Sequence, residues 1–179
     1  MTTWISLLRG INVGGKNILP MKELREWLDE LGYEEVRTYI QSGNCVFSAK
    51  ASSAQAVTKQ IAAKIESEAG FKPMVVTIKK SALDKSAEAN PFSQAIDNPA
   101  SVHFYFMDKK AGKPDLNALS ELRKHGEQFE LIGSVFYLYA PEGIARSKLA
   151  AAVESKLGVS ATARNYRTVL KLQELAEGS

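Results

Sequence analysis

The segment RGINVGGKN, from Arg9 to Asn17, contains the residue types that proteins use to bind an anion. Its glycines let backbone N–H groups turn inward and approach a ligand closely, and its two cations add positive charge. We therefore predict that this segment binds an anionic or phosphorylated small molecule. The candidate ligand-binding residues are Arg9, Gly10, Asn12, Gly14, Gly15 and Lys16. The alternative is that the glycines form only a tight turn and that the charges are solvated.

The same segment matches most of the phosphate-loop pattern GxxxxGK[ST], but the match fails at two positions. Asn17 replaces the hydroxyl residue that would bind magnesium. Pro20 places the predicted helix too late for Lys16 to stand at its N-terminus. The sequence therefore argues against hydrolysis of nucleoside triphosphates.

A second polar stretch, Gln41-Ser42-Gly43-Asn44, lies between two runs of strand-forming residues. Its Gly and Asn tolerate positive φ, which is typical of a β-hairpin turn. In the topology predicted below, this turn lies at the same end of a sheet as the glycine-rich segment. We therefore add Ser42 and Asn44 to the candidate ligand-binding residues, with plain turn chemistry as the alternative.

A third polar region combines PEGIARSK, residues 141–148, with ARNYRT, residues 163–168. Each stretch leads into a predicted helix, and the N-terminus of a helix favours an anion. Basic side chains in a first turn oppose the helix dipole, a local conflict that a ligand or an acidic partner would relieve. The candidate residues here are Arg146, Ser147, Lys148, Arg164, Asn165 and Thr168. Alternatively, Asn165 is a helix N-cap and the arginines lie on the surface.

This chain has few residues that could form other kinds of catalytic site. Cys45 is the single cysteine, which excludes an internal disulfide or a CxxC motif, and we predict a buried apolar thiol. The two histidines, His103 and His125, leave little material for a Ser-His-Asp triad, and no GxSxG motif occurs. We expect no metal and no cofactor, and the sequence leaves open whether the protein is an enzyme.

Hydrophobic periodicity predicts the elements that position these clusters. A helix from about 20 to 31 has one apolar face, begins at Pro20 and ends before Gly32. The other elements of the first half are strands at 3–8, 36–40, 45–47 and 74–78 and a helix over 57–65. The second half repeats the order with strands at 102–107, 129–132, 135–139 and 159–163 and helices over 116–122, 149–157 and, at the end, 165–176.

This order predicts an α+β fold of two successive ferredoxin-like βαββαβ halves with antiparallel sheets and a C-terminal helix. The predicted domains are residues 1–79 and 101–179, joined by a connector at 80–100 that two Asn-Pro pairs interrupt. Alternation along the first strand places Trp4 and Leu8 on one sheet face. We expect the second half, a ligand or another copy of the chain to cover that face, so an oligomer is a further expectation.

Composition excludes several classes of protein. The chain has 179 residues, of which 45% are hydrophobic, an ordinary share for a globular core. Its net charge of +3 is too small for a basic nucleic-acid arm. The N-terminus lacks the pattern of a signal peptide, and the longest uncharged run, Thr38 to Ala49, is too short to cross a bilayer. We expect a cytoplasmic protein without membrane contact.

Four motifs occur along the chain in one order: LLRGINVGGKN with TYIQSGNCVF after an amphipathic helix, NPF at 90–92, YLYAPEGIARSKL at 137–149, and TARNYRTVLKL at 162–172. Together they resemble a widespread bacterial family known as domain of unknown function 1697. In that family the last motif typically has Trp where this chain has Tyr166. The resemblance implies a two-subdomain α+β fold related to ferredoxin-like units, and it implies no reaction.

Three functions remain open on the sequence. The first, which we favour, is binding of an anionic small molecule at the glycine-rich segment. The second is nucleic-acid binding, because ferredoxin-like sheets can stack bases on exposed aromatic side chains such as Trp4, Tyr39 or Phe47. The third is binding of a partner protein without any ligand.

Overall fold

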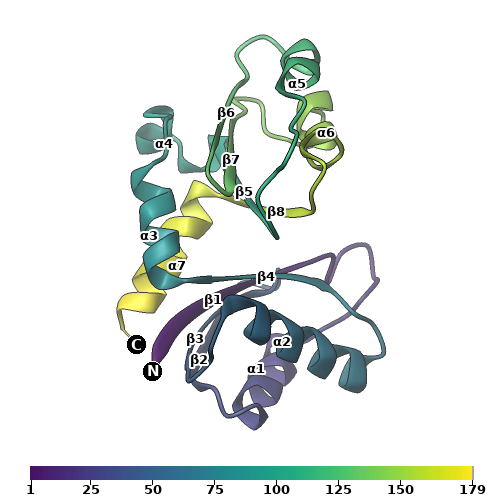
Figure 1. Ribbon diagram of the computed structural model, residues 1–179, viewed down its shortest axis with the longest axis vertical. Helices are drawn as coiled ribbons and strands as arrows, with labels where there is room; N and C mark the ends of the chain where they lie inside the picture. The colour runs from purple at the N-terminus through teal and green to yellow at the C-terminus, as the bar shows by residue number, and fades with distance from the viewer. Residues whose placement is uncertain (179) are drawn as a thin grey trace. The chain divides into compact units, whose positions relative to one another are not determined.

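The computed structural model describes residues 1–178 and contains two successive βαββαβ halves followed by a helix, as the sequence predicted (Figure 1). The first half consists of β1 (Thr2–Arg9), α1 (Met21–Glu30), β2 (Glu34–Tyr39), β3 (Asn44–Ala49), α2 (Ala54–Ala69) and β4 (Met74–Lys79). The second half consists of β5 (Val102–Met107), α5 (Leu116–Leu122), β6 (Gln128–Ile132), β7 (Val135–Tyr139), α6 (Lys148–Leu157) and β8 (Ala161–Asn165). The final helix is α7 (Tyr166–Glu177).

Each half forms one four-stranded antiparallel sheet. The strand order is β2-β3-β1-β4 in the first sheet and β6-β7-β5-β8 in the second, so corresponding strands take corresponding places. In such a sheet, the loop after the first strand and the hairpin between the second and third strands lie at the same end. The predicted α+β class with two similar antiparallel halves is confirmed.

The second helix of each half has the same end signals. Ser53 and Ser147 are the N-caps of α2 and α6, and each hydroxyl accepts a hydrogen bond from a backbone N–H of the first turn. Gly70 and Gly158 end these helices in the left-handed conformation, with φ of 76° and 69°. Both helices therefore begin at a serine that caps the first turn and end at a glycine that readily adopts the left-handed conformation.

The core of the first half lies between its sheet and helices α1 and α2. Trp4 and Leu8 of β1 are buried there against residues such as Leu24, Leu28 and Ile61. The helices of the same half therefore cover the face with Trp4 and Leu8, so the expectation that the second half, a ligand or another copy of the chain covers it is wrong. Alternation along a strand separates two faces, but it does not tell which of them the helices cover.

The second half has a core of the same kind. Tyr105 of β5 and Leu138 of β7 pack with Leu119 of α5 and with Leu149 and Val153 of α6. Burial raises the pKa of the Tyr105 phenol far above its ordinary value, and the nearby carboxylates of Glu154 and Glu127 add to the shift. Tyr105 is therefore a neutral core residue rather than an acid or a base.

The predicted connector is more helical than expected. It contains α3 (Lys80–Glu88), α4 (Gln94–Asp97) and a 3₁₀ turn at Pro99–Ser101. Leu83 anchors α3 because its side chain is fully buried, and Asp84 accepts a hydrogen bond from Gln173 of α7 at 2.9 Å. The Asn-Pro pairs do interrupt the chain, but only between these short helices.

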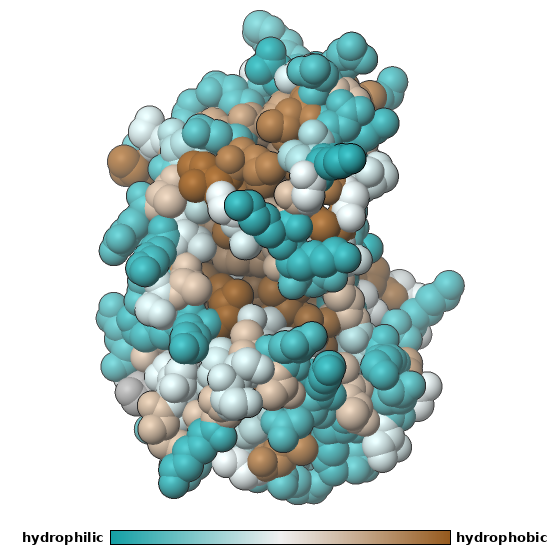
Figure 2. Space-filling view, viewed as in Figure 1, coloured by the Kyte–Doolittle hydropathy of each residue, from teal (hydrophilic) through white to brown (hydrophobic). Residues whose placement is uncertain are grey.

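The chain divides into two compact units. Unit 1 comprises Met1–Lys85 and the end of α7 from Leu170, and unit 2 comprises Ser86–Val169. The predicted second domain therefore loses the end of α7 to unit 1, where Arg37 of β2 donates a hydrogen bond to the carbonyl of Leu175 at 2.7 Å. Hydrophilic residues cover most of the face drawn in Figure 2. No helix among residues 1–178 combines the length and the apolar character needed to span a bilayer.

Candidate functional site

Asn12 holds the loop after β1 in one shape. Its Nδ2 donates to the carbonyl oxygens of Leu19 at 2.9 Å and Gln41 at 2.8 Å, and its Oδ1 accepts from the N–H of Leu19 at 2.7 Å. The residue has a φ of 54°, a left-handed conformation that asparagine tolerates better than most residues. One side chain therefore closes the loop and joins it to the β2–β3 hairpin.

The tip of this loop is a two-residue turn. Gly14 and Gly15 have φ values of 58° and 73°, as a type I′ turn requires, and the N–H of Lys16 donates to the carbonyl of Val13 at 3.1 Å. Below the tip, the Nδ2 of Asn17 donates to the carbonyl of Gly10 at 2.9 Å. The glycines form a tight turn here, and the Asn17 side chain bonds within the loop.

The β2–β3 hairpin packs directly against the end of β1. The N–H of Leu8 donates to the carbonyl of Gly43 at 2.9 Å. A Cβ atom at position 43 would lie 2.5 Å from Leu8 Cβ, so only glycine fits. The Nδ2 of Asn44 donates to the Ser42 hydroxyl at 2.9 Å, which is turn chemistry. The predicted proximity of the loop and the hairpin is confirmed, and their role in ligand binding stays a prediction.

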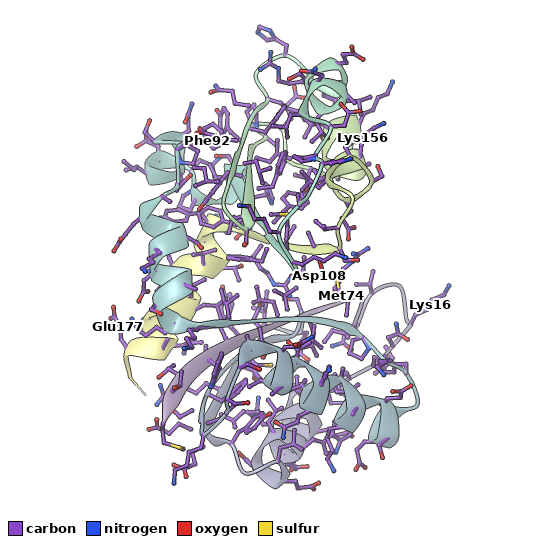
Figure 3. All side chains as sticks on the ribbon, viewed as in Figure 1. Lys16, Met74, Phe92, Asp108, Lys156 and Glu177 are labelled. Atoms are coloured by element: carbon purple, nitrogen blue, oxygen red, sulfur yellow. The ribbon has the colours of Figure 1, made fainter. Side chains whose placement is uncertain are left out.

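Exposed side chains of these two segments form what we call the loop-end surface. Its members are Arg9, Val13, Lys16, Ile18 and Ile40. Val13, Ile18 and Ile40 are 68%, 60% and 54% exposed, although they are aliphatic. Lys16 extends away from the loop (Figure 3). Nη1 of Arg9 lies 3.7 Å from the sulfur of Met74 on β4. The surface therefore combines apolar side chains with two cations.

Most polar groups of the second cluster are occupied by local bonds. Asn165 is an N-cap, because its Oδ1 accepts from the N–H of Thr168 at 3.0 Å, and Ser147 caps α6 in the same way. Nη1 of Arg164 donates to the Thr162 hydroxyl and to the carbonyl of Ala163, both at 2.8 Å. The alternative interpretation of Asn165 as a helix cap is therefore correct. The side chains of Arg146 and Lys148 are exposed.

Strand pairing places the two stretches of this cluster at one end of the second sheet, as the topology predicted. β7 and β8 both run antiparallel to β5 and flank it, so both end where β5 begins. His103 lies at this end and pairs with Leu138 on one side and Asn165 on the other.

His103 is a buried residue that sequence reasoning placed in a strand without assigning it a role. Its Nε2 is buried and has no hydrogen-bond partner, and burial lowers the pKa of the imidazole below its ordinary value of 6.5. The ring is therefore neutral near pH 7. Cys45 is buried, as predicted. Among residues 1–178, no three His, Cys, Asp or Glu side chains gather closely enough to hold a metal ion.

A pocket of unit 1 was missed from the sequence. It has a volume of about 420 Å³. It lies where β1 begins and β3 ends, at the end of the first sheet opposite the loop-end surface. Tyr33, Glu34, Lys50 and Gln60 are its main polar residues. They come from three separate segments without a shared motif, and the only local signal is the turn at Gly32 that precedes Tyr33.

Comparisons with known proteins confirm the resemblance that the sequence motifs indicate, and the last two motifs lie almost entirely beyond the residues that the family model matches. A family model described as "Protein of unknown function (DUF1697)" matches residues 1–137. No curated protein matches the chain. Among solved structures, the chain is similar to the conserved bacterial protein SP0830 from Streptococcus pneumoniae, with 25% sequence identity, a TM-score of 0.68 and coverage of 98% of each chain. Because the family model covers more than half of its length, this chain belongs to the DUF1697 family.

Proposed function

We propose that this protein is a binding protein and that its loop-end surface contacts an acidic region of a partner protein. The observation that carries the proposal is the exposure of Val13, Ile18 and Ile40 on segments that Asn12 holds together. Exposed aliphatic side chains on an ordered loop are typical of a contact surface, because their burial by a partner releases water at little cost in loop ordering. Arg9 and Lys16 favour negative charge on that partner.

A nest for a small phosphorylated molecule has less support than the sequence suggested. Such a nest needs N–H donors that point at the ligand. In this loop the backbone N–H groups of Asn12 and Lys16 donate to the carbonyls of Asn17 and Val13, each at 3.1 Å. These donors form hydrogen bonds within the loop. This favours contact with the surface of a partner protein over binding of an enclosed anion.

Nucleic-acid binding also loses its main argument. Of the aromatic side chains that could stack on bases, Trp4 and Phe47 are buried in the helix-covered core of the first half. Tyr39 is half-buried at the end of β2. The two cations of the loop-end surface alone give only a weak attraction for a phosphate backbone. We infer from the strand order that both halves are ferredoxin-like units, but this fold by itself assigns no function.

Affinity enrichment with matched variants tests the proposal. The bait is the full chain, and the variant combines Val13→Ser, Ile18→Ser and Lys16→Glu. The control combines Ile96→Ser with Lys110→Gln, because Ile96 is also exposed, at 80%, and lies outside the loop end. We expect at least one acidic bacterial protein that the wild type and the control retain and that the variant loses. For that partner, measured with purified proteins, we expect the variant to raise the Kd about tenfold or more.

Two results would overturn the proposal. One is a set of retained proteins that the loop-end variant leaves unchanged while circular dichroism shows that it is folded. The other is an increase in Tm by inorganic phosphate or a mononucleotide that Arg9→Ala and Lys16→Ala abolish. That second result would restore the small-anion function that the sequence favours.

A further inference from the structure

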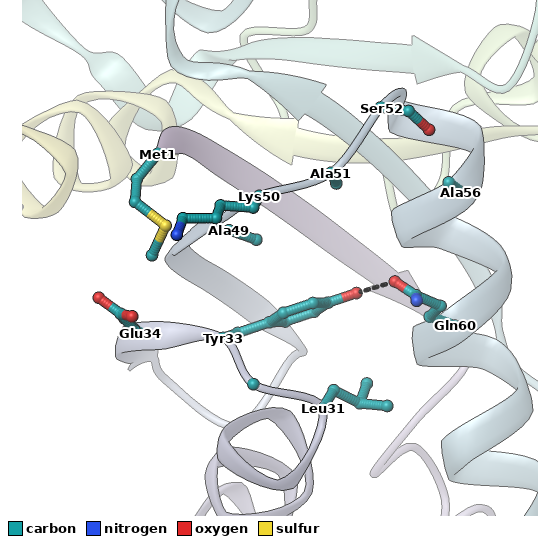
Figure 4. A pocket seen from close by; sticks show the side chains of 11 residues that line it. Met1, Leu31, Tyr33, Glu34, Ala49, Lys50, Ala51, Ser52, Ala56 and Gln60 are labelled. Atoms are coloured by element: carbon teal, nitrogen blue, oxygen red, sulfur yellow. Dashed lines mark hydrogen bonds between the residues drawn. The ribbon is translucent and has the colours of Figure 1, made fainter.

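The pocket at the other end of unit 1 offers a binding site that is independent of the loop-end surface. Its walls come from the turn between α1 and β2, the end of β3 and the first turns of α2 (Figure 4). The volume of about 420 Å³ lies near the lower limit of small-molecule sites, which span roughly 300–1,000 Å³. Leu31, Ala49 and Ala56 supply the apolar part of a mostly polar lining, so the pocket suits a small polar molecule that also has an apolar part.

Tyr33 is held rigidly in this pocket. Its ring stacks on Phe47 with a centroid distance of 4.7 Å and an interplanar angle of 6°, and its hydroxyl donates to Oε1 of Gln60 at 2.7 Å. Burial raises the pKa of Tyr33 to about 12, so the phenol stays neutral and keeps donating at physiological pH. Because its oxygen is engaged by Tyr33, the Gln60 amide offers its N–H donors for further bonds.

An irregularity in β2 brings Tyr33 to this position. The pairing with β3 shifts between Glu34 and Arg37, and Glu35 has a φ of 54°. The extra residue of this β-bulge breaks the alternation of faces, so that both Tyr33 and Val36 pack against the helix-side core. Bulges of this kind are frequent next to functional sites, where they redirect a side chain.

Two opposite charges lie on the same side of the pocket. Figure 4 shows the Lys50 ammonium and the Glu34 carboxylate on one side, with the Tyr33 hydroxyl and Gln60 on the other. Lys50 and Glu34 form no salt bridge with each other within 4.0 Å. Each charge is therefore available to a ligand that carries the opposite charge.

We propose that this pocket binds a free α-amino acid with an apolar or amide side chain. An α-amino acid carries its carboxylate and ammonium groups on one carbon atom. The carboxylate would pair with Lys50 and the ammonium group with Glu34, which lie on the same side of the pocket. The ligand's side chain would then extend along Tyr33 and Leu31 toward the amide of Gln60. The proposal concerns binding without a chemical reaction.

The test is a titration of the ¹⁵N-labelled full chain followed by two-dimensional NMR. The probes are L-leucine, L-methionine and L-glutamine, up to about 10 mM, which would saturate a Kd of about 1 mM or tighter. We expect progressive amide shifts confined to residues 31–34, 49–52, 56 and 60. The N-acetylated amides of the same amino acids, which lack both charges, are expected to bind about tenfold more weakly or not at all.

Variants test whether the ligand recognises the charges of Lys50 and Glu34 in particular, or whether the loss of any surface charge weakens binding. Lys50→Gln and Glu34→Gln should each raise the Kd about tenfold, because each removes one charge pair with the ligand. The controls are Lys110→Gln and Glu130→Gln, since both residues are exposed and Glu130 lies on β6, the counterpart of β2. Absence of shifts at this pocket, or equal binding of the uncharged derivatives, would overturn the proposal. Neither result would bear on the loop-end surface.

Discussion

The Asn12 side chain pairs with both backbone groups of Leu19, accepting from its N–H at 2.7 Å and donating to its C=O at 2.9 Å. The amide thus makes the two hydrogen bonds that the backbone of a neighbouring β-strand would make with Leu19. A third bond, to the carbonyl of Gln41, makes the same side chain the link between the loop and the hairpin. The shape of the loop-end surface therefore depends on one residue.

Replacement of Asn12 tests this dependence. Asn12→Ala removes three hydrogen bonds and places alanine at a positive φ, so we expect a loss of about 2–3 kcal/mol in the free energy of unfolding. Denaturant unfolding measures the loss. Gln41→Ala is the control, because the bond from Asn12 reaches only the backbone carbonyl of Gln41. If the two variants are equally stable, Asn12 does not organise the loop.

Gly43 provides a second test, of packing rather than hydrogen bonding. In Gly43→Ala, the new methyl group would lie 2.5 Å from Leu8 Cβ and 2.9 Å from Ile11 Cδ1, at a φ of 75°. We expect a loss of about 3 kcal/mol, since steric overlap adds to the conformational cost. Gly14→Ala has a positive φ but no atom within 4 Å, so it should lose only about 1 kcal/mol. Equal losses in the two variants would mean that the hairpin moves away from β1.

The sequence predicted most of the fold because its signals are local. Pro20 and Gly32 bound α1, and the order of elements follows from hydrophobic periodicity alone. The β2 bulge at Glu35 and the left-handed Ile40 had no such signal, because neither residue type favours a positive φ. α3 was missed because it buries only Leu83, which is too little to show a period.

The candidate ligand-binding residues stay predictions, because the sequence patterns that suggest them fit more than one role. Glycine and asparagine in RGINVGGKN suit both a ligand nest and a tight turn, and the hydrogen bonds of Asn12 and Asn17 show how the turn is built. The pocket around Tyr33 depends on segments that meet only after folding, so no spacing in the sequence reveals it. The sequence patterns predicted the loops, and the structure shows which of their atoms are exposed.

Arg37 is expected to hold the end of α7 on unit 1. Its guanidinium donates to the carbonyls of Leu175 and Gly178, where the negative end of the helix dipole favours a cation. In Arg37→Gln, amide hydrogens in the last turn of α7 should exchange about tenfold faster or more, as judged by mass spectrometry, because both charge-assisted hydrogen bonds to these carbonyls are lost. Arg167→Ala, at the exposed start of the same helix, is the control and should leave that turn protected. Unchanged exchange in Arg37→Gln would show that packing alone holds the helix end.

His103 predicts how stability depends on pH. Because its pKa is lowered in the folded protein, the unfolded chain binds a proton below pH 6.5 that the folded chain does not. The free energy of unfolding should therefore be constant above about pH 6.5 and fall by about 1.4 kcal/mol per pH unit below it, until the folded pKa is reached. Unfolding curves in urea between pH 5 and pH 7 measure this slope.

His103→Phe should abolish this slope and cost little at pH 7, since it replaces a buried ring whose Nε2 has no partner by an apolar ring. His125→Gln is the control, because His125 is exposed and its removal should leave the slope in place. A slope that survives in His103→Phe would assign the proton to another group. A large loss of stability for His103→Phe at pH 7 would instead show that the imidazole makes a bond that an apolar ring cannot replace.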